Sequence, residues 1–176
     1  MRLTRLLAAT LGALLVLVLL AGYLLPLIGS LLEKSYEVSS EGVYVLTESR
    51  WTRVKLDGYF WSPPDNGGYI VYFNNLRCPA CRAFDPTWED FAKKYGRENF
   101  TLVEVVCTWF AISCSDPTAR ATFNAYSIYQ SPTLMVIYNM TILYKGVPPT
   151  AADEIFKLFN EAITFYRNAS LAVAGE

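Results

Sequence analysis

Short apolar runs beyond residue 42 predict the strands of one folded domain. They are rich in the β-branched and aromatic side chains that strands favour, and they lie at residues 43–46, 69–73, 100–107, 134–138 and 141–144. The last two runs are separated only by Asn139 and Met140, which indicates a hairpin. Residues 62–68 are serine, proline, aspartate, asparagine and glycine, so this segment is expected to be a loop.

Apolar residues at helical spacing predict the helices that cover these strands. One such face is followed by Gly96, a residue type that commonly ends helices, and consists of Phe84, Trp88, Phe91 and Tyr95. Asp116 is expected to cap a second helix over residues 117–126. Residues 150–166 predict the closing helix.

A further helix is expected before the loop at residues 62–68, because Thr47 is a suitable N-cap and Trp51 and Val54 would share its inner face. With it, the elements follow the order β-α-β-α-β-α-β-β-α, which is typical of an α/β fold with a central mixed sheet flanked by helices. We divide the chain into residues 1–32 as an N-terminal membrane anchor or uncleaved signal, 33–42 as a linker, 43–168 as the folded domain and 169–176 as a C-terminal tail.

Residues 6–32 form an uncharged run dominated by leucine, valine and alanine. The run is longer than the roughly 20 residues that cross a bilayer and the roughly 7 to 15 apolar residues of a cleavable signal peptide, so an uncleaved transmembrane helix is expected. Arg2 and Arg5 precede the run, so the positive-inside rule places the N-terminus in the cytoplasm. The expected location is the cell membrane, with a single pass and an extracytoplasmic folded domain.

Composition excludes several classes of function. The formal net charge is -1 and the lysine and arginine residues are scattered, so no basic surface for nucleic acid is predicted. The chain has no histidine, which excludes the usual hydrolytic triads and imidazole metal ligands. It has four cysteines, which suit the oxidising compartment expected for an exported domain. Thiol chemistry is therefore the leading hypothesis.

Two cysteines lie at the expected start of the helix that contains Phe84, in the sequence Cys78-Pro79-Ala80-Cys81. The unpaired N–H groups and dipole of a helix start stabilise a thiolate at the first position. Cys78 is therefore expected to exchange disulfides with a substrate, and Cys81, one turn further in, to resolve the mixed disulfide. Pro79 and Ala80 form the active-site loop, in which Pro79 pre-shapes the first helical turn. A static disulfide and half of a metal site are the alternatives.

The surroundings of this pair resemble the thioredoxin-like family over roughly residues 43–167. The matching features follow in order: the strand at residues 69–73 before the cysteines, Pro86 eight residues after Cys78, Ser131-Pro132-Thr133 before the strand at residues 134–137, and Lys145-Gly146 before the last helix. The resemblance implies a thioredoxin-like fold with a cis Pro132 against the cysteine pair. It also implies that Ser131, Pro132 and Thr133 bind the substrate, and that no cofactor or metal is used.

The sequence departs from the family at a position where a buried carboxylate usually helps to move protons to and from the second thiol. Tyr72 stands there, six residues before Cys78. Glu104 on the neighbouring strand is a weak substitute and is expected to face solvent.

Cys107 and Cys114 form a second pair, separated by six residues. A structural disulfide that staples this loop is the favoured interpretation, since exported domains gain stability from such links. An auxiliary redox pair, free thiols and metal binding remain alternatives.

Together, the residues and the resemblance predict a thiol-disulfide oxidoreductase, that is, a protein disulfide oxidase, reductase or isomerase acting outside the cytoplasmic membrane through Cys78 and Cys81. The expected partners are protein thiols and disulfides, with a membrane redox partner as a further candidate and no nucleic acid. The alternative is a non-enzymatic, membrane-anchored binding module, such as a chaperone or metalloprotein assembly factor, in which Cys78 and Cys81 form a structural disulfide.

Overall fold

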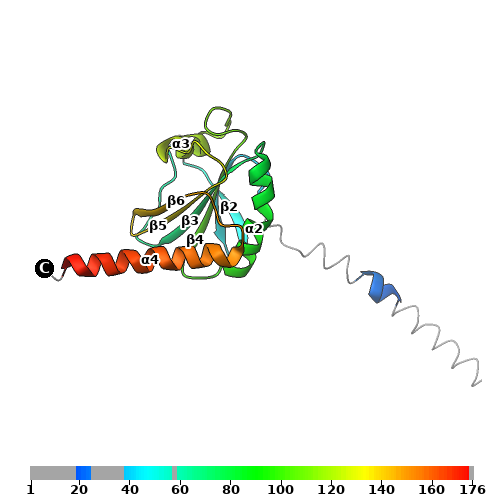
Figure 1. The fold of residues 1–176 in the computed structure, drawn as a ribbon. Helices are drawn as coiled ribbons and strands as arrows, with labels where there is room; N and C mark the ends of the chain where they lie inside the picture. Colours follow the sequence, from blue (N-terminus) through cyan, green and yellow to red (C-terminus); the bar gives the residue numbers. More distant parts are fainter. Residues whose placement is uncertain (1–18, 25–37, 57–58, 175–176) are drawn as a thin grey trace, which may run out of the picture. The chain divides into compact units, whose positions relative to one another are not determined.

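The computed structural model describes residues 19–24, 38–56 and 59–174 (Figure 1). The chain divides into two units, Met1–Ser35 and Tyr36–Glu176. Most of the expected membrane segment lies outside the described residues. Its described part, residues 19–24, is helical. Within the described part of the chain, none of the helices has the length and apolar character needed to span a bilayer.

The described residues of the second unit form one mixed sheet with the strand order β2-β1-β4-β3-β5-β6. The strands are β1 (Gly42–Thr47), β2 (Arg50–Val54), β3 (Gly68–Asn75), β4 (Thr101–Cys107), β5 (Thr133–Tyr138) and β6 (Thr141–Gly146). Only β3 and β4 run parallel, and the other neighbours are antiparallel. Every residue of β3 is buried, because this strand is central and both of its faces are covered.

Helices cover both faces of the sheet (Figure 1). They are α2 (Pro79–Tyr95), α3 (Pro117–Ala125) and α4 (Ala152–Ala174). Successive side chains of β3 point to opposite faces. Ile70 and Tyr72 therefore join the core under α2 and α4, whereas Val71 and Phe73 join the core under α3.

Most of the elements expected from the sequence are confirmed. Helix α2 is followed by Gly96 as its C-cap, and β5 and β6 form the expected hairpin. Asp116 caps α3, since its Oδ1 accepts a hydrogen bond from the Ala119 N–H at 2.7 Å. Helix α4 begins close to the expected position and extends to Ala174, which is beyond residue 166.

The helix expected after Thr47 is wrong. The segment forms strand β2, which pairs antiparallel with β1 and places Thr47 opposite Arg50. Glu48 and Ser49 connect the strands with φ values of 50° and 67°, and two positive φ values are what a tight hairpin turn requires. This turn lacks the Asn-Gly or Asp-Gly pair that usually reveals it in a sequence. Trp51 contacts Trp88 of α2, with ring centroids 6.0 Å apart, so a tertiary contact replaces the expected helical face.

Candidate active site

Strand β3 and helix α2 bring the two cysteines of the predicted redox pair together. Cys78 is the N-cap of α2, and its Sγ accepts a hydrogen bond from the backbone N–H of Cys81 at 3.4 Å. Pro79 occupies the first turn of the helix, where its missing N–H removes no helical hydrogen bond. Both cysteines are buried and carry free thiols, so the structure represents the dithiol form of the pair. Pro79 and Ala80 between them are exposed.

The surroundings shift the pKa values of the two thiols in opposite directions. Burial disfavours ionisation of Cys78, but hydrogen bonds from Cys81, from the Ala80 backbone and from the Ser131 side chain outweigh it and lower the pKa of Cys78. Burial raises the pKa of the Cys81 thiol to about 11, although hydrogen bonds involving Ser131 and Asn75 act against that rise. Cys78 is thus the more acidic thiol and Cys81 the more basic, which suits a nucleophile and a resolving thiol respectively.

The loop before β5 lies directly against both sulfurs. The Ser131-Pro132 peptide bond is cis. The Cys78 thiol donates to the backbone carbonyl of Ser131 at 3.6 Å, and the Cys81 sulfur lies 2.6 Å from the Ser131 hydroxyl. Thr133 begins β5 opposite Phe73 of β3, and its hydroxyl donates to the Gln130 carbonyl at 2.8 Å. The structure therefore brings the segment from Ser131 to Thr133 next to the cysteine pair.

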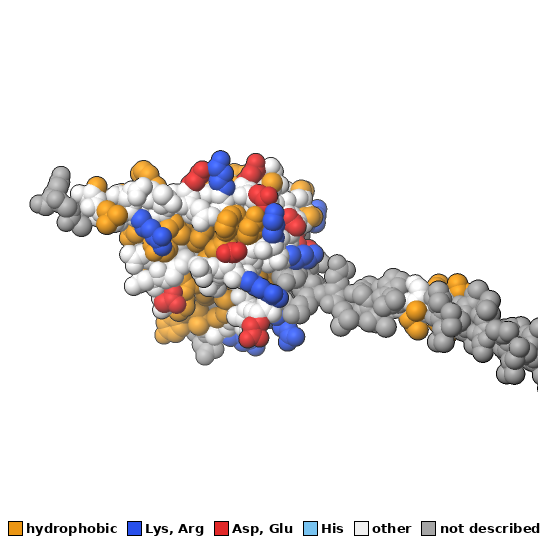
Figure 2. Space-filling model, turned by 90° about the horizontal axis from the view of Figure 1, so that it is seen from below, with side chains coloured by type: hydrophobic (Ala, Val, Ile, Leu, Met, Phe, Trp, Pro, Cys, Tyr) orange, Lys and Arg blue, Asp and Glu red, His pale blue; other side chains and the backbone are white. Residues whose placement is uncertain are grey.

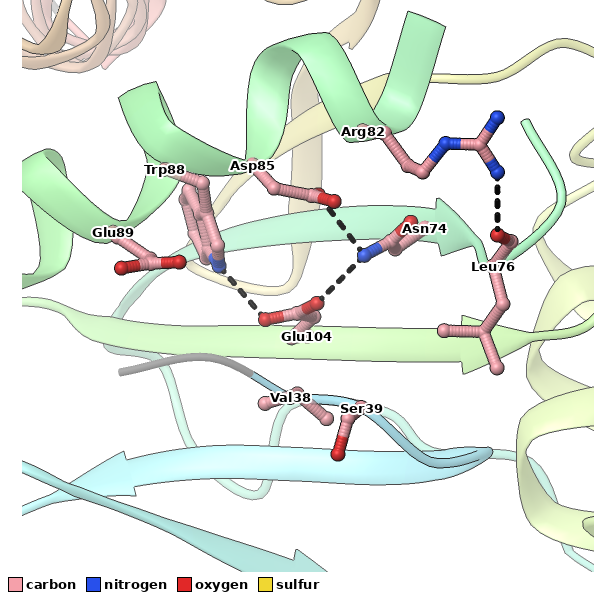
Figure 3. A pocket seen from close by; sticks show the side chains of 9 residues that line it. All are labelled: Val38, Ser39, Asn74, Leu76, Arg82, Asp85, Trp88, Glu89 and Glu104. Atoms are coloured by element: carbon pink, nitrogen blue, oxygen red, sulfur yellow. Dashed lines mark hydrogen bonds between the residues drawn. The ribbon is translucent and has the colours of Figure 1, made fainter. Parts of the chain in front are cut away.

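A buried polar cluster lies between α2, β3 and β4 (Figure 3). The expectation that Glu104 faces solvent is wrong, since the residue is only 3 % exposed. Its carboxyl oxygens accept hydrogen bonds from Asn74 Nδ2 and Trp88 Nε1, each at 3.0 Å. Asp85 joins the cluster because its Oδ1 accepts from Asn74 Nδ2 at 3.2 Å and from the Tyr72 hydroxyl at 2.9 Å. In the sequence, the signal for this cluster is Glu104, a single acidic residue within the apolar run of β4.

Burial raises the pKa values of two members of this cluster. Burial raises the pKa of the Glu104 carboxyl to about 8, and the negative charges of Asp85 and Glu89 act in the same direction. Burial also raises the pKa of the Tyr72 hydroxyl strongly, and negative charge on Cys81 or Asp85 raises it further. The Tyr72 hydroxyl therefore stays neutral, and its pKa depends on the charges of both Cys81 and Asp85.

A small pocket opens beside this cluster, and the residues that line it include Asn74, Asp85, Glu104, Ser39 and Arg82 (Figure 3). Asn74 Oδ1 is buried and has no hydrogen-bond partner among the described residues. Buried polar atoms are usually satisfied by protein or ordered water. The pocket is therefore a suitable place for water next to the carboxyl groups.

Cys107 and Cys114 are joined by a disulfide that closes the loop after β4. Both residues are buried in the core under α3, which also contains Phe123. Cys81 belongs to α2, which covers the opposite face of the sheet. This separation favours the structural interpretation of the disulfide over the auxiliary redox pair.

The loop closed by this disulfide is fixed beside the start of α2. The Arg77 N–H donates to the Thr108 carbonyl at 3.2 Å, which extends the pairing of β3 and β4 as far as the residue before Cys78. Glu41 holds the base of the loop, because its carboxylate accepts from the backbone N–H groups of Thr108 and Ser115, each at 2.7 Å. Burial raises the pKa of Glu41, but hydrogen bonds from Ser115 and Thr108 outweigh it and lower the pKa to about 2. Sequence reasoning missed this role, since Glu41 lies in the expected linker.

Comparison with known proteins yields similarity in fold alone. No protein-family model and no curated protein matches the sequence. Thioredoxin from Aeropyrum pernix is 19% identical over 68% of this chain and 93% of its own, with a TM-score of 0.49. Thioredoxin-2 of the malaria parasite, described as a component of its protein secretion machinery, is 18% identical over 62% of this chain and 99% of its own, with a TM-score of 0.45.

Thioredoxin O2 from Arabidopsis thaliana is 14% identical over 55% of this chain and 75% of its own, with a TM-score of 0.40. The arrangement of the chain's own elements defines the fold. The mixed sheet carries helices on both faces, a Cys-Pro-Ala-Cys sequence begins α2, and a cis Pro132 lies in the segment packed against that pair. The chain is thioredoxin-like in fold.

Proposed function

We propose that this protein is a thiol-disulfide oxidoreductase that exchanges disulfides with protein clients through Cys78 and Cys81. The observation that carries the proposal is the position of the pair: Cys78 is the N-cap of α2, and both sulfurs contact Ser131 in the loop before β5. The pKa of Cys78 is lowered, whereas burial raises that of Cys81 to about 11. Because the thiolate is the reactive form, Cys78 is the group that exchanges with clients.

Reduction of a client proceeds in two exchanges. The Cys78 thiolate attacks one sulfur of the client disulfide, and the other client sulfur leaves as a thiolate that takes up a proton. The Cys81 thiolate then attacks the Cys78 sulfur and releases the first client sulfur, which is protonated in turn. Two electrons pass to the client, and Cys78 and Cys81 become a disulfide. Client oxidation is the reverse sequence, and an external dithiol or disulfide restores the pair for the next turnover.

The proton on Cys81 must leave before the second exchange. The Ser131 hydroxyl lies 2.6 Å from the Cys81 sulfur and stabilises the thiolate that forms. We infer that the cluster of Tyr72, Asp85, Asn74 and Glu104 takes up this proton and passes it to water in the pocket beside it. Two observations support this role: the hydrogen bonds that link the cluster, and a Glu104 pKa of about 8, which allows the carboxyl to gain and lose a proton near neutral pH.

We further propose that the domain acts outside the cytoplasmic membrane and is held there by an N-terminal anchor. The uncharged run at residues 6–32, with Arg2 and Arg5 before it, supports this orientation. The disulfide between Cys107 and Cys114 suits an oxidising compartment. Protease treatment of intact cells or spheroplasts tests the proposal, because an extracytoplasmic domain is digested without lysis and a cytoplasmic one is protected.

The proposed activity is tested with the full chain in two assays, reduction of the disulfides of insulin and oxidative refolding of a reduced protein. Cys78→Ser is expected to abolish both activities. Cys81→Ser retains the first exchange but not the second, so it is expected to accumulate a mixed disulfide with the client. Equal activity of the wild type and Cys78→Ser in both assays would exclude the enzyme and leave the binding-module alternative.

A further inference from the structure

Two surface loops are hydrogen-bonded to Cys78 and to the residue before it. The Cys78 thiol donates to the Ser131 carbonyl in the loop of residues 126–133. The backbone N–H of Arg77 donates to the Thr108 carbonyl in the loop of residues 107–114. A client whose sulfur forms a disulfide of roughly 2.05 Å with Cys78 comes close to these two loops, which we call the client rim.

The client rim is uncharged and exposes large apolar side chains. Neither loop contains a lysine, arginine, aspartate or glutamate. The loop of residues 107–114 exposes Trp109 by 42 % and Ile112 by 89 %, and the loop of residues 126–133 exposes Tyr129 by 83 %. Clusters of exposed apolar side chains commonly mark sites of interaction.

The charged residues nearest to Cys78 in the sequence are both cations, Arg77 and Arg82, and both are exposed. Lys145 adds a third cation beside the loop of residues 126–133, where it lines a shallow pocket with Tyr129 and Thr133. Figure 2 shows one face of the molecule, on which basic and acidic side chains lie among apolar ones. Glu41 is an anion at the base of the loop of residues 107–114, where its carboxylate accepts from the backbone N–H groups of Thr108 and Ser115. With three cations and this one anion, the surroundings of Cys78 complement a client segment that is apolar and neutral or acidic.

The loop of residues 107–114 is pre-organised for such a contact. The Cys107–Cys114 disulfide closes it, and Trp109 and Ser113 exchange two backbone hydrogen bonds, of 3.0 and 3.1 Å. The Phe110 N–H donates to Asn75 Oδ1 at 2.6 Å, which fixes the loop to the end of β3. A loop that is already ordered loses little conformational entropy when a client binds.

We propose that the client rim is a recognition site for extended protein segments in which the reactive cysteine is flanked by an apolar side chain, with an acidic or neutral residue preferred to a basic one. Trp109 and Ile112 contact the apolar side chain and act as specificity-determining residues. The proposal rests on the proposed exchange function of Cys78, and it gives the disulfide-closed loop a part in client choice in addition to its structural role.

The test uses the reduced full chain and peptides whose single cysteine is bonded to thionitrobenzoate. Attack by Cys78 forms a disulfide with the peptide and releases the thionitrobenzoate anion, which is followed by its absorbance. The peptides differ only in the residues that flank the cysteine, which are leucine, serine, aspartate or lysine. The wild type is expected to react about fivefold faster with the leucine peptide than with the serine peptide, and slowest with the lysine peptide.

Ile112→Ser and Trp109→Ser are expected to remove the preference for leucine without changing the rate with the small disulfide of two thionitrobenzoate groups. Ile112 is almost fully exposed, so its replacement leaves the folded core intact. Phe165→Ser is the matched control, because Phe165 is a 78 % exposed aromatic residue on α4, outside both loops, and its loss is expected to leave every rate unchanged.

Three results would overturn the proposal: equal rates of the wild type with all peptides, loss of the leucine preference in Phe165→Ser, or an Ile112→Ser variant that slows the small disulfide as much as the peptides. In each of these cases the reaction of Cys78 itself persists, so the proposed exchange function stands. A wild type that reacts with neither probe would overturn both proposals.

Discussion

The Ser131 hydroxyl lies 2.6 Å from the sulfur of Cys81, and the carbonyl of the same serine accepts a hydrogen bond from the Cys78 thiol. One residue of the loop before β5 therefore contacts both members of the redox pair. Its side chain favours the thiolate of Cys81, the thiol with the raised pKa. The Ser131 hydroxyl can therefore influence the second exchange, and the Ser131 carbonyl helps to hold Cys78 in place.

Ser131→Ala is expected to slow the resolving step roughly tenfold, since a hydrogen bond to a charged group is lost while the backbone contact to Cys78 remains. Stopped-flow release of the client thiol measures this step separately from the first attack. Ser131→Thr keeps the hydroxyl and is expected to keep most of the rate. A resolving rate that is the same in Ser131→Ala and the wild type would show that the hydroxyl does not act on Cys81.

Alkylation of Cys78 by iodoacetamide is expected to follow a pKa below that of an ordinary cysteine. Hydrogen bonds from Cys81, Ala80 and Ser131 favour its thiolate despite burial, so the pKa is lowered. The measurement is the alkylation rate against pH, with mass spectrometry to identify the labelled residue. Preferential labelling of Cys81, or a midpoint no lower than that of a cysteine in an unstructured peptide, would contradict the assigned roles.

The raised pKa of Glu104 predicts that the free energy of unfolding declines as the pH rises. Its pKa is raised by burial to about 8 in the folded chain, compared with 4.5 for an ordinary glutamate, so between these values the folded state holds a proton that the unfolded state has lost. The free energy of unfolding should then fall by up to about 1.4 kcal/mol per pH unit over that window and level off above it.

Denaturant unfolding at several pH values from 5 to 9 measures this slope. Glu104→Gln has no titrating carboxyl at this position and is expected to be less pH-dependent in the same window, whatever its absolute stability. Glu98→Gln, at an exposed position after α2, is the matched control and should keep the wild-type slope. An unchanged slope in Glu104→Gln would mean that the carboxyl is ionised in the folded protein.

Removal of the Cys107–Cys114 disulfide is expected to lower the free energy of unfolding by about 2 to 3 kcal/mol, because the unfolded chain gains the freedom of a short loop. The seven-residue separation of the two cysteines sets the size of that loop. A Cys107→Ala, Cys114→Ala double variant tests this by denaturant unfolding. Cys78 should still react with a small disulfide in this variant, since the sulfurs of the second pair lie in the core under α3. Loss of catalytic turnover with this first attack intact would instead support the auxiliary redox pair.

The sequence by itself determined the elements that have a local signal. The spacing of Phe84, Trp88 and Phe91 predicted α2, and Cys78-Pro79-Ala80-Cys81 marked its start. These signals are local, because helical periodicity, capping and the distance between two nearby cysteines depend on residues only a few positions apart. The strands of the central sheet were found for the same reason. The hairpin of β1 and β2 was missed, since Glu48 and Ser49 form its turn without the usual turn residues.

Only the tertiary structure decided how distant segments meet at the site. It placed Glu104 inside the molecule next to Asn74 and Trp88, which come from different elements. It also brought Ser131 to the sulfurs, fifty residues from Cys81 along the chain. Burial, and with it the pKa of a buried carboxyl or thiol, depends on everything that packs around the group, and no local pattern of residues contains that information.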